Sequence, residues 1–299
     1  MKAYFPSYYQ RFKCIADKCK NSCCVGWEIR VDDVTLEKYR RLDGALGDEV
    51  RTRVCSNGVI EMCDDGRCPF LDERGLCRII SAVGEGYISD ICREHPRFYY
   101  KVGNRTYGGI GLSCEEAARI ILSSDDFAKF IELEHSSEPP VETEFDTLEE
   151  RDFLFALLLD KSMPYGEKIK AIRCRYDLPD ILNEACEWNK ILSELEYLDE
   201  SRVGWISVGI ENRTESMSDY FVRFLAYLVF RHVSVADSYD NLRARVGFCL
   251  LLLSVFENMT ADSENSLDKI SDIARVISEE IEYSEDNTDS LIFEFECKI

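Results

Sequence analysis

The sequence predicts a mostly α-helical protein in two parts: an irregular, cysteine-rich N-terminal module with little β-structure, and an α-helical C-terminal domain. The first observation behind this prediction is the distribution of cysteine, since ten of the 14 cysteines lie within the first 114 of 299 residues. The second is charge: residues 1–124 carry 19 basic and 18 acidic side chains, whereas residues 125–299 carry 17 and 39. A change of composition at one point indicates two domains. We therefore predict a cysteine-rich metal or iron–sulfur module over 1–124 and an acidic helical domain over 125–299, with Pro139-Pro140 in the connecting linker.

The first part contains short-range signals. Weak alternation over 26–32 predicts a strand, and the pattern that follows predicts a helix over 35–46. Ser113 stands three positions before Glu116, a spacing typical of a capping box at a helix start. We interpret the glycines at 108, 109 and 111 as a turn rather than a phosphate-binding loop.

Apolar residues at helical spacing define the second part. They predict helices over 148–159, from Pro179 to about 198, from 220 to about 233 after a Ser218-Asp219 cap, over 237–259 and over 267–283. The longest apolar run, Phe248 to Phe256, is far shorter than the roughly 18–20 residues that span a bilayer, so it predicts a core helix.

Composition restricts the partners and the compartment. Aspartate and glutamate total 57 against 36 lysine and arginine, a formal charge of −21. This charge argues against nucleic acid or an anionic membrane as the main partner and is compatible with cationic ligands such as lysine side chains. The N-terminus lacks the features of a secretory signal. We therefore expect a cytoplasmic protein with reduced cysteines.

The cysteine spacing indicates a thiolate-bound centre. One group is Cys14-x4-Cys19-x3-Cys23-Cys24, and a second begins with Cys68 and Cys77 and continues to Cys92 and Cys114. Thiolates are soft ligands suited to zinc and to iron–sulfur clusters, and spacing alone does not choose between them. A disulfide framework and buried free cysteines are the alternatives. We assign the four later cysteines to packing or surface positions: Cys174, Cys186, Cys249 and Cys297.

Four blocks of sequence resemble the flagellin lysine-N-methylases, and more broadly the cysteine-cluster proteins thought to chelate zinc or iron. They occur in the family's order and spacing over about the first 120 residues. The blocks are Tyr8-Tyr9-x2-Phe12-x-Cys14-Ile15-x3-Cys19-x3-Cys23-Cys24-x-Gly26-Trp27, Cys68-Pro69-Phe70-Leu71-x3-Gly75-Leu76-Cys77-x-Ile79, Cys92-x3-Pro96-Arg97 and Ser113-Cys114-x-Glu116-Ala117-Ala118-Arg119.

The resemblance implies a cytoplasmic enzyme that transfers methyl from S-adenosylmethionine to lysine side chains of flagellin. It also implies a [4Fe–4S] cluster held by cysteines, with zinc as the alternative metal. Carried over by position, the candidate ligands are Cys14, Cys19, Cys23, Cys24, Cys68, Cys77, Cys92 and Cys114. Cys55 and Cys63 lie outside the blocks and rank lower.

Methyl transfer to lysine sets its own requirements. The amine has a reference pKa of about 10.4 and must lose a proton before it attacks the sulfonium methyl. Among the residues near the cysteine blocks, we expect His95, Glu94 and Tyr9 to act catalytically. We expect Trp27, Tyr99 and Arg97 to bind the cofactor. The two aromatic residues would contact it through their π faces, and Arg97 would bind a carboxylate or neutralise thiolate charge.

Polar methyl transfer does not need an iron–sulfur cluster, and the adjacent Cys23-Cys24 pair departs from the cysteine triplet of radical S-adenosylmethionine enzymes. We therefore expect the cluster to be structural or to position S-adenosylmethionine. Two other classes of function are open: a non-catalytic zinc- or iron-chelating protein, and an iron–sulfur redox sensor or flagellar partner.

Overall fold

A computed structural model describes residues 2–134, 142–143, 145–209, 217–261 and 263–299. The chain divides into two compact units. The cysteine unit is Lys13–Arg97, and the helical unit comprises the residues up to Phe12 and those from Phe98 to Ile299. The boundary expected at residue 124 falls inside the helical unit. That residues 1–124 and 125–299 are separate domains therefore stays a prediction, and the expected linker at 139–140 lies outside the described residues.

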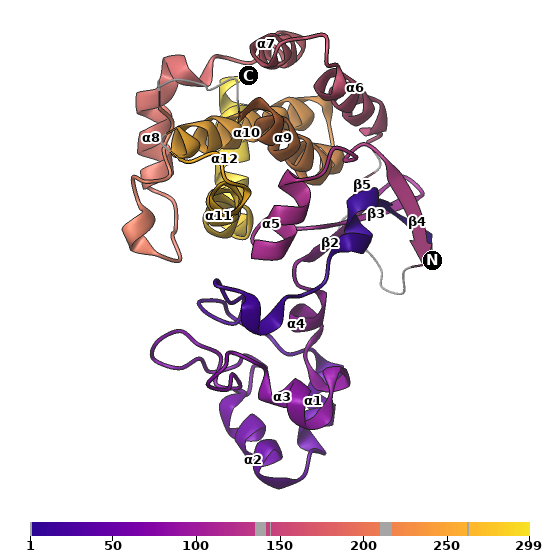
Figure 1. The fold of residues 1–299 in the computed structure, drawn as a ribbon, viewed down its shortest axis with the longest axis vertical. Coiled ribbons are helices and arrows are strands. Elements are labelled where there is room, and N and C mark those ends of the chain that lie inside the picture. Colours follow the sequence, from indigo (N-terminus) through magenta and orange to yellow (C-terminus); the bar gives the residue numbers. More distant parts are fainter. Residues whose placement is uncertain (1, 135–141, 144, 210–216, 262) are drawn as a thin grey trace. The chain divides into compact units, whose positions relative to one another are not determined.

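Four short helices and irregular loops make up the cysteine unit: α1 (Asp33–Arg40), α2 (Gly44–Arg53), α3 (Arg78–Val83) and α4 (Asp90–Glu94) (Figure 1). Its own small core consists of buried Ile29, Val31, Tyr39, Val50, Ile60, Cys68, Phe70, Ile79 and Ile88. The Asp32 carboxylate connects two of the helices, because it accepts hydrogen bonds from the Thr35 amide (2.9 Å) and from the Asp90 amide (3.0 Å).

A five-stranded sheet with the order β4-β1-β3-β2-β5 forms one part of the helical unit. Its strands are β1 (Lys2–Pro6), β2 (Arg97–Val102), β3 (Arg105–Ile110), β4 (Phe130–Glu134) and β5 (Glu142–Thr143). β1 is parallel to β3, with Tyr4 opposite Tyr107, and antiparallel to β4, with Phe5 opposite Ile131. The first strand of the chain therefore lies between two strands that follow the cysteine unit in sequence.

Helices make up the rest of this unit: α5 (Glu115–Leu122), α6 (Leu148–Leu159), α7 (Tyr165–Tyr176), α8 (Ala185–Ser193), α9 (Ser218–His232), α10 (Tyr239–Thr260), α11 (Leu267–Ile277) and α12 (Glu285–Lys298). The almost wholly buried α10 packs against α9, α11 and α12. A short π-helical segment, Ser278–Glu282, follows α11. Among the described helices, none combines the length and apolar character needed to span a bilayer.

Aromatic packing joins the sheet to the helices. The Phe230 ring of α9 lies 5.4 Å from the Tyr100 ring of β2 and 5.6 Å from the Phe130 ring of β4. Glycine makes room for these rings, since a Cβ at Gly109 would lie 2.6 Å from the Phe98 ring. The predicted turn is therefore wrong for Gly108 and Gly109, which lie in β3 as small residues in a crowded layer.

The mostly helical fold class is confirmed, and the helix over 148–159 has the predicted bounds. The predicted strand over 26–32 is wrong, because the segment makes only isolated bridges such as Arg30 with Val59. The predicted helix over 35–46 is two helices, broken before Gly44, whose φ of +81° is incompatible with a continuing α-helix. Ser113 is not the N-cap of α5; Cys114 holds that position, and its side chain makes no capping hydrogen bond.

Candidate functional site

Tight turns bring distant cysteines of the cysteine unit together. Gly66 and Gly75, both with a φ of +76°, close two turns, and Cys68 and Cys77 lie two residues after them. Such a backbone conformation favours glycine because it has no Cβ. The Cys68 amide then donates a hydrogen bond to the Cys24 carbonyl at 2.8 Å, which fixes two cysteine segments side by side.

Four thiols from separate segments form one group, which we call the thiol group: Cys24, Cys68, Cys77 and Cys92. Burial raises the pKa of Cys68, and the charges of the other three thiols raise it further, to about 12. Burial has the largest effect on Cys92, and the charges of Cys24 and Cys77 add to it, so that its pKa rises to about 11. Burial also raises the pKa of Cys77, against hydrogen bonds from backbone amides at the start of α3.

Cys24 differs from its three neighbours. A hydrogen bond from the Cys23 side chain, helped by Ser22, lowers its pKa to about 7 even though burial opposes ionisation. The group thus contains one readily ionised thiol and three that resist ionisation. A bound cation would relieve that resistance, because it offsets the mutual repulsion of buried thiolates.

The donor chemistry of the thiol group suits zinc or an iron–sulfur cluster, each of which takes four sulfur ligands. In the part of the chain that the structure describes, however, no three Cys, His, Asp or Glu side chains stand in an arrangement that could hold a metal ion. Binding therefore requires the thiols to move together. That they are ligands stays a prediction.

The other four candidate ligands are not members of the thiol group, although the Cys23 side chain touches it through its hydrogen bond to Cys24. Cys14 and Cys23 are exposed, and the Cys19 thiol donates to the Asn21 carbonyl at 3.1 Å. Cys114 belongs to the helical unit, where it precedes α5. The structure therefore groups four of the eight predicted cysteines, places Cys23 against Cys24 at the edge of the group, and does not place Cys14, Cys19 or Cys114 in it.

Two residues next to the thiol group were missed by the sequence analysis. Tyr39 is buried on α1, and its pKa is raised by burial and then by the charges of Cys92, Cys77 and Cys68. The Arg78 guanidinium lies 2.5 Å from the Glu49 carboxylate, and this hydrogen bond raises the pKa of Arg78. The charges of Cys68 and Cys77 raise it further. Arg78 could have been noticed because it directly follows Cys77, whereas Tyr39 gives no signal beyond its helical spacing.

An open pocket of about 220 Å³ lies beside the thiol group, in the same unit. Cys63 and Cys68 line it together with Asp65, Asp72, Glu73, Arg67, Pro69 and Leu71. Cys63, which the sequence blocks do not include, thus lies close to one member of the group.

The predicted catalytic and cofactor-binding residues are divided between the units. Glu94 ends α4, two residues after Cys92, and His95 follows it. Arg97 donates to the Arg93 carbonyl at 3.3 Å, and Trp27 is half-buried in the same unit. These roles stay predictions.

Tyr9 and Tyr99 lie in the helical unit, and the rings of both are close to that of Phe5. Their ring centroids are 4.3 Å and 6.3 Å from that of Phe5. Both tyrosines thus take part in aromatic packing, and their predicted roles toward substrate and cofactor are untested.

Comparison with known proteins finds lysine-N-methylases. The chain is 28% identical over 134 residues to the "Lysine-N-methylase" of Salmonella typhimurium, covering 40% of this chain and 32% of that protein. It is 29% identical over 133 residues to the "Flagellar biosynthetic protein FliU" of Salmonella muenchen, covering 77% of that protein. The alignment thus spans about a third of the lysine-N-methylase. No family model and no solved structure matches.

Proposed function

We propose, from the relationship of this chain to the flagellin lysine-N-methylase family, that it is a protein-lysine N-methyltransferase. The printed names of the relatives suggest methyl transfer and a link to the flagellum. Our proposal adds that the methyl donor is S-adenosylmethionine, that the acceptor is lysine of flagellin, and that the reaction takes place in the cytoplasm. The observation that carries it is the match to a lysine-N-methylase and to a flagellar biosynthetic protein, and the gathering of four thiols supports it.

The proposed reaction moves one methyl group and one proton. The neutral lysine Nζ attacks the methyl carbon of the sulfonium, the carbon–sulfur bond breaks, and S-adenosylhomocysteine leaves. The proton of the lysine ammonium must first pass to an acceptor. Glu94 and His95 are our candidates because Glu94 is the last residue of α4, the short helix that carries Cys92, and His95 directly follows it.

A metal centre would be held by Cys24, Cys68, Cys77 and Cys92. When bound, it would supply a cation that keeps four thiolates together and fixes the loops that carry them. The hydrogen bond from the Cys68 amide to the Cys24 carbonyl and the packing of Cys68 in the small core already orient two of these ligands. We propose this structural role, or positioning of S-adenosylmethionine, for the centre.

The test is methyl transfer by anaerobically purified protein. Labelled S-adenosylmethionine and purified flagellin should give labelled flagellin whose mass rises by whole methyl groups. Cys68→Ser should lose bound metal and activity together, whereas Cys174→Ser, on an exposed position of α7, should keep both. Unlabelled flagellin after incubation with metal-loaded wild-type protein would refute the proposal.

A non-catalytic metal-chelating protein is the second candidate. The observation that favours it is that the thiol group lies within one unit that has its own core, without any residue of the helical unit. Stoichiometric zinc in colourless protein that does not bind S-adenosylmethionine would favour this candidate over the enzyme.

A further inference from the structure

Exposed apolar side chains gather on one short segment of the helical unit, 194–206, which we call the Trp205 segment. Leu198 is 51% exposed, Val203 43% and Trp205 48%. Within the described residues, no other stretch of eight positions holds three large exposed hydrophobic side chains. Tryptophan exposed to this extent is unusual, because its burial is worth more than that of most side chains.

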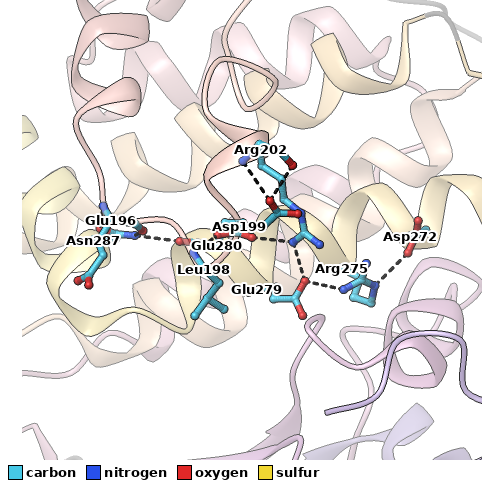
Figure 2. Close-up of polar contacts among 10 residues, drawn as sticks. Glu196, Leu198, Asp199, Arg202, Asp272, Arg275, Glu279, Glu280 and Asn287 are labelled. Atoms are coloured by element: carbon cyan, nitrogen blue, oxygen red, sulfur yellow. Dashed lines mark hydrogen bonds and ion pairs between the residues drawn. The ribbon is translucent and has the colours of Figure 1, made fainter. Parts of the chain in front are cut away.

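The Trp205 segment is held firmly on the C-terminal helices. The Glu196 amide donates to Asn287 Oδ1 (3.0 Å), and Asn287 Nδ2 donates back to the Glu196 carbonyl (2.6 Å). The Leu198 amide donates to Glu280 Oε2 at 2.7 Å. Figure 2 shows these contacts converging on the π-helical segment and the start of α12.

Arg202 anchors the other half of the segment. One guanidinium nitrogen lies 2.6 Å from Glu280 Oε1 and 2.7 Å from Glu279 Oε2, and Arg275 shares that Glu279 oxygen at 2.6 Å (Figure 2). Glu280 is buried, so its pairing with Arg202 is better shielded from salt than a surface ion pair. The apolar side chains are therefore exposed on an ordered support, which reduces the entropy lost when a partner binds.

Negative charge surrounds the apolar side chains. Of the residues labelled in Figure 2, Arg202 and Arg275 are cationic, and both are engaged with carboxylates. The exposed carboxylates on the segment itself are Glu194, Glu196, Asp199 and Glu200. Glu280 is buried and Glu279 is largely covered, and both are paired with Arg202, so they support the segment rather than add charge to its surface. A surface that is apolar at its centre and acidic around it fits a partner that is apolar and basic.

We propose that the Trp205 segment is a docking surface for a basic, amphipathic segment of the lysine-bearing protein substrate. This inference rests on the proposed function in so far as the partner is the methyl acceptor. A second copy of this chain would bring the same negative charge, and an anionic membrane would be repelled. A lysine-bearing protein segment brings both complementary features.

The experiment measures binding of purified flagellin to the full chain by calorimetry, and its methylation in parallel. Trp205→Ala should weaken binding at least about tenfold, because a central aromatic contact dominates such interfaces. It should raise KM for flagellin more than it changes kcat, since no residue of the segment is among those proposed to take part in the methyl transfer. Glu196→Gln combined with Glu200→Gln should weaken binding less and reduce its dependence on salt.

Phe293→Ala is the matched control, because Phe293 is 61% exposed on α12. It should bind flagellin as the wild type does, and circular dichroism should show that both variants are folded. Binding of Trp205→Ala with wild-type affinity, equal losses in both variants, or no binding of flagellin to wild-type protein would each overturn the docking surface.

The two proposals can fail separately. If Trp205→Ala loses flagellin binding but wild-type protein never changes the mass of flagellin, the docking proposal is supported and the methyl-transfer proposal is refuted. If the variant methylates flagellin with the wild-type KM, the methyl-transfer proposal is supported and the docking proposal is refuted.

Discussion

The cysteine unit and the helical unit are stabilised in different ways. The cysteine unit has nine buried residues in its core, one of them Cys68, and helices as short as the five residues of α4. The helical unit is built around α10, which has 22 residues and is buried along most of its length. A small core rarely stabilises a domain without a metal, a disulfide or a partner. The thiol group therefore lies in the unit whose small core would gain most from an additional stabilising interaction.

Breaking the thiol group should have the largest effect. Cys68→Ser, or removal of metal with a chelator, should destabilise the cysteine unit by an amount on the order of several kcal/mol, because metal binding is coupled to folding. Hydrogen exchange should then show loss of protection over 13–97 and retained protection in α10. Cys174→Ser serves as the control, and unchanged protection over 13–97 after chelation would contradict the expectation.

Truncating the core of the helical unit should have the next largest effect. The Phe256 ring is fully buried and lies 4.2 Å from the Phe224 ring, so Phe256→Ala should lower the free energy of unfolding by about 3–5 kcal/mol. Urea unfolding of this unit measures the change. Phe293→Ala removes an exposed ring and should stay within about 0.5 kcal/mol of wild type. A loss of hydrogen-exchange protection over 13–97 in Phe256→Ala would show that the units are not independent.

Acid should act first on the helical unit through a buried pair. His232 Nε2 lies 2.7 Å from Glu282 Oε1, and burial lowers the pKa of His232 below its usual 6.5. The folded state therefore binds this proton less readily than the unfolded state, so stability falls as the pH decreases below about 6.5. Burial opposes ionisation of Glu282, but Arg231 and His232 outweigh it and lower its pKa, which adds a further loss below its usual 4.5.

Urea unfolding at several pH values measures this dependence. His232→Gln removes the titrating ring. The free energy of unfolding should then change less with pH between pH 7 and the onset of carboxylate protonation. The effect should be smaller than that of Phe256→Ala. An unchanged slope in the variant would exclude His232 as its source.

We expect the smallest effects from removing one helix cap in each unit, and the two substitutions can be compared directly. Asp32→Ala removes hydrogen bonds to two helices of the cysteine unit, and Ser238→Ala removes the 3.2 Å bond to the Asn241 amide at the start of α10. We expect losses of about 1–2 and about 1 kcal/mol respectively. Thermal unfolding measures both, with Ser290→Ala on the exposed side of α12 as control. A larger loss for Ser238→Ala would contradict the idea that the cysteine unit depends more on local links.

Long helices with regular apolar spacing were predictable, and the irregular parts were not. The bounds of α6 and the buried face of α9, with Phe221, Phe224, Leu225 and Leu228, follow from periodicity. The helix predicted from Pro179 to about 198 begins as a 3₁₀ turn and ends at Ser193. The helix predicted over 267–283 contains a π-helical segment, because hydrogen-bond spacing is decided by packing that periodicity does not record.

Spacing also could not show which cysteines meet. The sequence treats Cys23 and Cys24 alike, and Cys92 and Cys114 alike. The structure places Cys24 and Cys92 in the thiol group, leaves Cys23 exposed and assigns Cys114 to the other unit. These differences depend on turns such as that at Gly66 and on pairing between distant strands, which no local pattern contains.

The position of β1 has a consequence for synthesis on the ribosome. β1 emerges first, yet its neighbours β3 and β4 are made only after the whole of Lys13–Arg97 has been translated. The cysteine unit can therefore fold, and acquire any metal, while the strand that precedes it still waits for its partners. If the unit needs the metal that we propose, a shortage of that metal during translation would leave a disordered insert between β1 and the rest of its sheet.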